Sequence, residues 1–151
     1  MSTRIPLQIN EGRLVLKSLV ECPKIRVPKH FMDFVVDTGS QNSFLSSKDA
    51  SKMQIPLKNR PIQGEIDFGG SRYNQVLLPK FKMYLLKEDN TKKDYITLQV
   101  SLTALKTTKT SEKKMQVAYM LPSILGMDFL KNQKLSLYLN LTENIAYLQF
   151  E

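Results

Sequence analysis

The sequence predicts an all-β domain that carries one or two short helices. Short runs rich in Val, Ile, Leu, Phe and Tyr recur along the 151 residues, and several alternate with polar residues as strands do. Turn residues separate these runs at Glu11-Gly12, Gly69-Gly70, Asn90-Thr91 and 140–144, which indicates hairpins. Helical periodicity is scarce, so helices are expected to be few and short.

The expected elements follow one another at short intervals along the chain. Ser47–Met53 is expected to form one or two helical turns, and Met127–Asn132 a short helix after Gly126. The polar segment Lys106–Lys114 is expected to be a surface loop. The expected strands are Arg4–Ile9, Arg13–Leu19, Phe31–Val36, Gln63–Phe68, Arg72–Leu78, Phe81–Lys87, Tyr95–Leu102, Gln116–Met120, Leu135–Asn140 and Ile145–Phe150.

The composition is that of a single soluble domain. The chain is 42% hydrophobic and 24% charged, and its length suits one domain over residues 1–151. No run approaches the ~20 apolar residues of a membrane span. The N-terminus lacks the uninterrupted apolar core of a signal peptide. We therefore expect a cytoplasmic protein with no membrane contact.

The net charge and the numbers of cysteines and histidines limit the kinds of binding site that the chain can form. The net charge of +8 raises the question of nucleic acid, but the lysines lie in or beside polar loops without interleaved aromatic residues, which argues against that partner. A basic surface that attracts acidic partners or substrates stays open. With Cys22 and His30 as the one cysteine and the one histidine, an internal disulfide and a multi-cysteine zinc site are excluded. We expect no metal and no cofactor.

The tetrapeptide Asp37-Thr38-Gly39-Ser40 follows the apolar run Phe31–Val36 directly. A strand would deliver this carboxylate into a turn where backbone N–H groups can orient it. Asp33 shares the strand parity of Asp37 and is interpreted as an exposed acid. Two further segments follow along the chain: a glycine-rich hairpin over residues 63–73, and Ile124-Leu125-Gly126 ahead of the Met127–Asn132 helix.

The order of these three segments resembles the retropepsin family of single-domain aspartic proteases. The resemblance spans about Leu14 to Leu139 and is closer to the cellular and prokaryotic members than to the viral enzymes. It implies a closed β-barrel with a flap hairpin and one short C-terminal helix, acting as a homodimer. Asp37 would be the catalytic carboxylate, contributed once by each subunit.

The resemblance also implies roles for the neighbouring residues. Thr38 would bond across the dimer, Gly39 would bring an N–H to the carboxylate, and the Ser40 hydroxyl would bond to Asp37. Met127 stands where the viral pattern has an arginine, and Asp128 is expected to cap the short helix. Ile124, Leu125 and Gly126 would pack behind the catalytic loop. The flap would contain Ile66, Asp67, Phe68, Gly69 and Gly70.

Two carboxylates about 3 Å apart repel by about 5 kcal/mol at an effective dielectric of ~20, so they share one proton. The pair would activate a water for attack on a peptide bond, without a metal or a covalent intermediate. The expected function is therefore that of a homodimeric aspartic endopeptidase with a peptide or protein substrate. Two alternatives stay open: a retropepsin-like module that binds peptides without turnover, and a basic β-barrel that binds nucleic acid.

Overall fold

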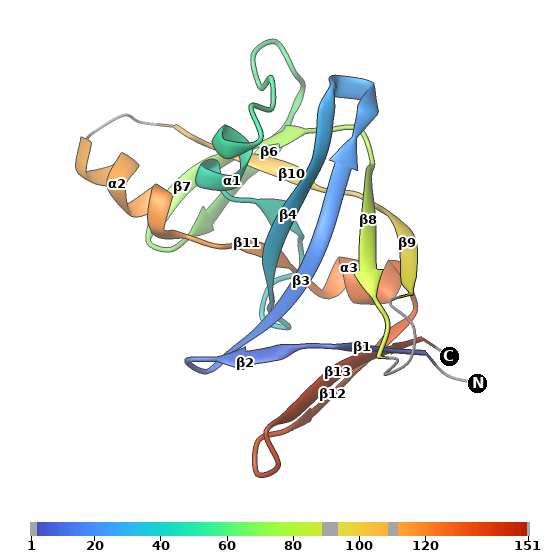
Figure 1. The fold of residues 1–151 in the computed structure, drawn as a ribbon. Coiled ribbons are helices and arrows are strands. Elements are labelled where there is room, and N and C mark those ends of the chain that lie inside the picture. The colour runs from blue at the N-terminus through green and yellow to red at the C-terminus, as the bar shows by residue number, and fades with distance from the viewer. Residues whose placement is uncertain (1–2, 89–93, 109–111, 151) are drawn as a thin grey trace.

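A computed structural model describes residues 3–88, 94–108 and 112–150, and most of them lie in strands (Figure 1). The strands are β1 (Thr3–Pro6), β2 (Gln8–Asn10), β3 (Arg13–Cys22), β4 (Val27–Val36), β5 (Phe44–Leu45), β6 (Ile62–Phe68), β7 (Ser71–Leu77), β8 (Phe81–Leu86), β9 (Tyr95–Val100), β10 (Thr103–Thr107), β11 (Ser123–Leu125), β12 (Leu135–Asn140) and β13 (Ile145–Phe150). The helices are the 3-10 turn η1 (Pro23–Ile25), α1 (Ser47–Lys52), α2 (Glu112–Met120) and α3 (Met127–Asn132).

The strands form two separate sheets. The larger sheet has the order β6-β7-β10-β5-β11-β4-β3-β8-β9, with β2 paired to β3, and the long β3–β4 hairpin lies at its centre (Figure 1). The smaller sheet has the order β1-β13-β12. The expected closed barrel is not formed by the part of the chain described. The path of the larger sheet ends at β6 and β9, and the C-terminal hairpin pairs with β1 instead of closing that path.

The core follows from the alternation of side chains along β3 and β4. In β4, Met32, Phe34 and Val36 are buried, while Phe31 and Asp33 point to the opposite face. A smaller cluster, which we call the second core, lies beside the main one and contains Phe44, Tyr73, Leu105, Ala118 and Ile124. Burial raises the pKa of the Tyr73 hydroxyl, which finds no hydrogen-bond partner among the residues described.

Several expected elements differ from those observed. The expected strand Gln116–Met120 is the second half of α2, where Ala118 is buried in the second core. Short apolar runs fit a strand or a helix equally well, and here the tertiary packing decides. The expected loop Lys106–Lys114 begins inside β10, which pairs with β7 and β5. Residues 109–111 and the expected turn at Asn90-Thr91 lie outside the described residues.

The two ends of the described chain are joined in the smaller sheet. The expected strand Arg4–Ile9 divides at Leu7, whose N–H donates to Ala146 O (2.9 Å), so that β1 pairs with β13 and β2 with β3. The guanidinium of Arg4 lies 4.3 Å from the centre of the Tyr147 ring, and that ring stacks on Tyr138. β13 therefore has a strand on each side within its own chain.

Two phenylalanines on one strand test this core. Phe34 is fully buried and Phe31 is 87% exposed. We expect Phe34→Ala to lower the free energy of unfolding by about 3–5 kcal/mol, because it leaves a cavity. We expect the matched control Phe31→Ala to change it by no more than about 0.5 kcal/mol. Urea unfolding of both variants measures the difference, and equal effects would contradict the assigned parity of β4.

Candidate active site

Asp37 is the first residue after β4, and backbone groups fix its position. Its N–H donates to Leu125 O (3.0 Å), and its Oδ1 accepts the N–H of Gly39 (2.8 Å). Its carbonyl accepts the N–H of Ser40 (3.2 Å). The side chain is half-buried. The carboxylate is thus oriented by its own loop while one edge remains accessible.

The segment after β11 supports this loop from behind. β11 runs parallel to β4 in the register Ile124 to Val35 and Leu125 to Val36. The N–H of Met127 then donates to Ser40 O (2.8 Å). A Cβ on Gly126 would lie 2.5 Å from Ser40 O and 2.6 Å from the carbonyl oxygen of Asn42. A glycine is therefore required at this close backbone approach.

A second contact joins the same two segments. The Oδ1 of Asp128 accepts the hydroxyl of Ser43 (2.5 Å) and the N–H of Phe129 (2.7 Å). The Ser43 hydroxyl oxygen in turn accepts the N–H of Gly126 (2.8 Å). Asp128 was expected only to cap α3. The cap position is instead Gly126, which has no side-chain cap, and Asp128 lies in the first turn of α3, where it connects this helix to the loop after Asp37.

The glycine-rich hairpin has its tip at Gly69-Gly70, between β6 and β7. Both glycines have positive φ (+59° and +80°), as a two-residue type I′ turn requires. Phe68 packs edge-on against Phe44, with ring centres 4.8 Å apart, and Ile66 also packs on the second core. Asp67 is exposed.

The hairpin tip and the Asp37 loop line one cavity, which we call the catalytic cavity. Its volume is about 560 Å³. Asp37, Thr38, Phe68 and Gly69 line it, whereas Ile66, Asp67 and Gly70 do not. The remaining lining residues are Ile9, Gly12, Arg13, Leu14, Val35, Val36, Leu121, Pro122, Ile124, Leu139 and Leu141. The structure therefore brings the Asp37 loop and the hairpin tip together across a mostly apolar cavity.

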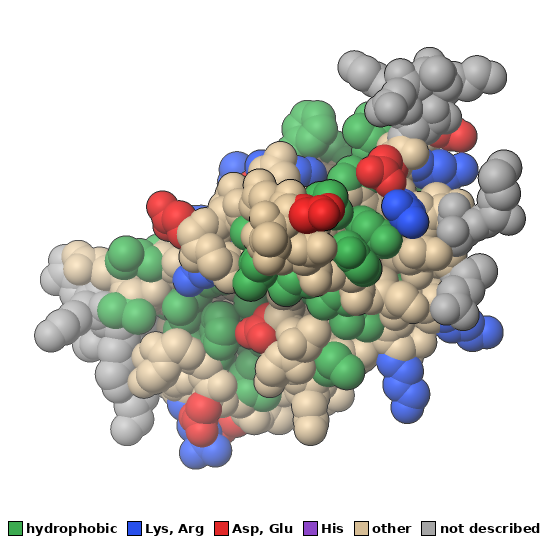
Figure 2. All heavy atoms as spheres, turned by 90° about the horizontal axis from the view of Figure 1, so that it is seen from below, with side chains coloured by type: hydrophobic (Ala, Val, Ile, Leu, Met, Phe, Trp, Pro, Cys, Tyr) green, Lys and Arg blue, Asp and Glu red, His purple; other side chains and the backbone are tan. Residues whose placement is uncertain are grey.

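Two lining residues from the C-terminal hairpin were not foreseen in the sequence. Leu139 and Leu141 are 44% and 69% exposed, and they lie about 100 residues beyond Asp37 in the chain. Figure 2 looks onto the end of the molecule where β2 and the β12–β13 hairpin lie. It shows hydrophobic side chains through the middle of this face and Lys and Arg mainly at its margins. No local pattern marks these leucines, because their place depends on the pairing of β12 with β13. Val35, by contrast, shares the strand parity of Asp37, which was a usable signal.

Two expected contacts of the catalytic loop turn out differently or stay open. The Ser40 hydroxyl donates to Asn42 O (2.8 Å), so its single proton is not available to Asp37. The expected Ser40–Asp37 bond is therefore not formed. Thr38 is exposed in the single chain and lines the catalytic cavity, and its contact across a dimer stays a prediction.

Other features of the described residues bear on the chemistry. Arg13 and Asp37 are the charged residues that line the catalytic cavity. No group of three or more His, Cys, Asp and Glu side chains with metal-site geometry occurs within residues 3–88, 94–108 and 112–150. Over the same ranges, no helix is both long enough and apolar enough to cross a membrane.

Comparisons with known proteins identify the family. A family model described as "Aspartyl protease" matches residues 24–129, well over half of the chain. Among solved structures, the chain is similar to the crystal structure of a retropepsin-like aspartic protease from Rickettsia conorii. The TM-score is 0.55 at 15% sequence identity, over 99% of this chain and 92% of that one. No curated protein matches by sequence. The resemblance to retropepsins is thereby confirmed at the level of fold, and the chain belongs to the aspartyl protease family.

Proposed function

We propose that this protein is a homodimeric aspartic endopeptidase in which each subunit contributes one Asp37. One observation carries the proposal. A carboxylate held by its own loop faces a cavity that a glycine-tipped hairpin also lines, and the chain holds a single Asp-Thr-Gly. Peptide hydrolysis by this chemistry requires two carboxylates, so a second identical chain would complete the site.

The proposed reaction uses the pair of carboxylates as acid and base. Two facing carboxylates cannot both ionise, and one proton is shared between them. The ionised Asp37 takes a proton from a water as that water attacks the peptide carbonyl. The protonated Asp37 of the second chain donates to the developing oxyanion, and the amine leaves after the roles reverse.

The exposed leucines of the C-terminal hairpin support a place for the second chain. Leu139 and Leu141 line the same cavity as Asp37 and Thr38, so a chain that covers them would also approach the catalytic loop. Tyr138 and Ile145, 44% and 43% exposed, lie on the opposite face of this hairpin from Leu139 and do not line the cavity. In the smaller sheet β13 lies between β1 and β12, so only those two strands offer an edge among the described residues, and β12 is the one that carries Leu139 of the cavity.

The substrate is proposed to bind as an extended strand between the catalytic loop and the hairpin. Val35, Phe68 and Ile124 would contact side chains next to the cleaved bond, which favours apolar residues there. Phe68 packs on Phe44, and a hairpin held in this way would exclude water from the bound substrate.

Replacement of the catalytic carboxylate tests the proposal directly. Asp37→Asn keeps the size of the side chain and removes the charge, so we expect kcat to fall by more than about 10³-fold without loss of stability. Cleavage of a peptide library at pH 3–8 provides the measurement. For the unchanged protein, kcat/KM should be bell-shaped in pH, because both the doubly protonated and the doubly ionised pair are inactive. Peptide binding without cleavage at every pH would support the non-catalytic module instead.

Dimerisation through the C-terminal hairpin gives a second test. Leu141→Glu places a charge on the proposed interface, so we expect it to weaken the dimer by about tenfold or more. Ile62→Glu is the matched control, because Ile62 is 55% exposed on β6 and does not line the catalytic cavity. Sedimentation velocity measures the dimer, and specific activity should fall with dilution in parallel. An active protein that stays monomeric would contradict the proposal.

The close approach at Gly126 gives a third test. Gly126→Ala adds a Cβ against the backbone of Ser40 and Asn42, so those segments must move apart. We expect a loss of about 1–3 kcal/mol in the free energy of unfolding. We also expect kcat to fall more than KM rises, because the loop that orients Asp37 is displaced. Thermal unfolding and steady-state kinetics measure the two effects. Unchanged values for both would show that the loop does not depend on this contact.

A further inference from the structure

A larger hollow, which we call the second groove, lies on the outer face of β3 and β4. Its volume is about 760 Å³, and it extends from β8 and β9 across the β3–β4 hairpin to α1. Its lining differs from that of the catalytic cavity except at Val35 and Pro122, and its other residues take no part in the proposed reaction. Its role is therefore open.

The second groove adjoins the catalytic cavity. Val35 and Pro122 line both hollows. Along β4 the residues Phe31, Asp33 and Val35 share the parity of Asp37, so one face of this strand leads from the catalytic carboxylate into the second groove. Phe31 lies six residues from Asp37, a distance of about 20 Å along an extended strand.

The lining of the second groove offers an apolar strip. Phe31 is 87% exposed in the middle of β4, and across β3 from it Leu86 on β8 and Tyr95 on β9 are 40% and 53% exposed. Tyr84 lies beside them, with the ammonium of Lys29 5.0 Å from the centre of its ring. Single exposed apolar residues are common on protein surfaces, but here three of them line one hollow together with the half-buried Tyr84.

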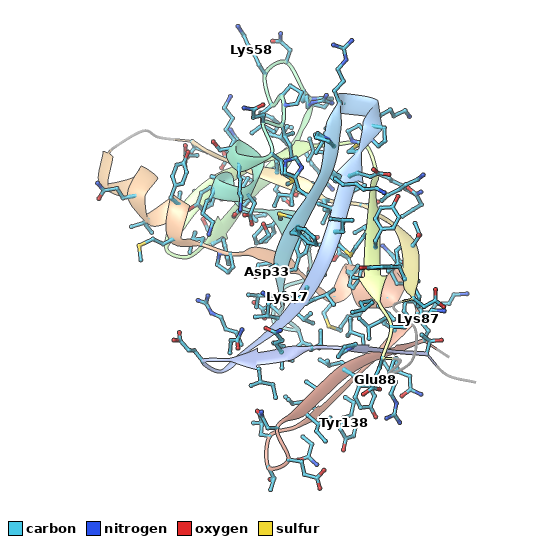
Figure 3. The ribbon with its side chains drawn as sticks, viewed as in Figure 1. Lys17, Asp33, Lys58, Lys87, Glu88 and Tyr138 are labelled. Carbon is cyan, nitrogen blue, oxygen red and sulfur yellow. The ribbon has the colours of Figure 1, made fainter. Side chains whose placement is uncertain are left out.

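The charges of the second groove favour an acidic ligand. Three lysines and two aspartates line it, and both aspartates have partners. Asp33 forms an ion pair with Lys17 at 2.8 Å (Figure 3), and Asp49 accepts the hydroxyl of Ser123 (2.5 Å). Within the described part of the chain, Lys48 and Lys52 form no salt bridge. Their ammonium groups are thus available to carboxylates of a bound chain.

We propose that the second groove binds the flank of the polypeptide substrate, about six residues away from the cleaved bond. The preferred flank carries an aromatic or large aliphatic side chain for the Phe31–Tyr95 strip and neighbouring acidic residues for Lys48 and Lys52. This inference rests on the proposed function, because the occupant is the same chain whose peptide bond lies at Asp37. The shared lining at Val35 and Pro122 is the reason to favour substrate over an unrelated partner.

The test compares a short and an extended substrate that share one cleaved sequence. The short probe is the best-cleaved octapeptide from a random library, which reaches about 13 Å on each side of the bond and stops before Phe31. The extended probe adds six residues at each end that include one Phe flanked by two Glu. A second extended probe has Ser and Lys at those places. We expect kcat/KM to rise by about tenfold from the short probe to the acidic extension, and not for the basic one.

Substitutions in the second groove test whether it causes the tenfold rise in kcat/KM for the acidic extended probe. Phe31→Ser and the double change Lys48→Glu, Lys52→Glu should each remove most of the tenfold gain, through KM, and leave cleavage of the octapeptide unchanged. Met120→Ser and Lys58→Glu are matched controls. Met120 is 80% exposed and lines neither hollow, and Lys58 lies on a loop far from the Lys17–Asp33 pair (Figure 3). Neither control should alter the gain.

A binding readout separates this inference from the proposed function. In the Asp37→Asn protein, a photoreactive phenylalanine analogue at position 31 should crosslink to the acidic extended probe and not to the octapeptide. Equal kcat/KM for all three probes, with no crosslink, would overturn the second groove as a substrate site while leaving the protease intact. Loss of the dimer in Phe31→Ser would also overturn it, because the face would then be an interface between copies. A crosslink in Asp37→Asn, together with no cleavage of any probe by the unchanged protein, would instead contradict the endopeptidase. The second groove would then remain a binding site.

Discussion

The parallel pairing of β11 with β4 is the constraint on which the rest of the site depends. The ladder continues one residue past the end of β4, where the N–H of Asp37 donates to Leu125 O. The next residue, Gly126, has no side chain, and this lets the carbonyls of Ser40 and Asn42 approach. The catalytic loop is therefore positioned by residues almost ninety positions later in the chain. Its geometry exists only when the larger sheet is assembled.

The Ser43–Asp128 contact holds the loop at its other end. Ser43 is buried, so its hydroxyl must be satisfied inside the protein, and it donates to Asp128 while accepting from Gly126. Loss of either partner would leave a buried polar group unpaired, at a cost of about 1–3 kcal/mol. The loop between these two contacts contains Thr38 and Gly39, which remain exposed in the single chain.

The features that the sequence predicted correctly depend on residues adjacent in the chain. The features that it missed depend on packing between distant segments. The Asp37 turn, the Gly69-Gly70 tip and the α3 helix were predictable because a few adjacent residues determine each of them. The second half of α2, Gln116–Met120, was wrongly expected to be a strand, because burial of Ala118 against the second core outweighs the apolar run. The closed barrel was wrong because β13 pairs with β1, a contact between the two ends of the chain. Leu139 and Leu141 reach the catalytic cavity through the pairing of β12 with β13.

The packing of Phe68 on Phe44 has a consequence for how temperature would act on the hairpin. The second core supplies the apolar contacts that keep this hairpin against the body of the protein. Hydrophobic contacts of this kind weaken on cooling, unlike hydrogen bonds between charged groups. If the hairpin is the lid over the catalytic cavity, cold would favour its open form. Opening of the hairpin to admit substrate would then raise the heat capacity, because it exposes the Phe68 side chain to water.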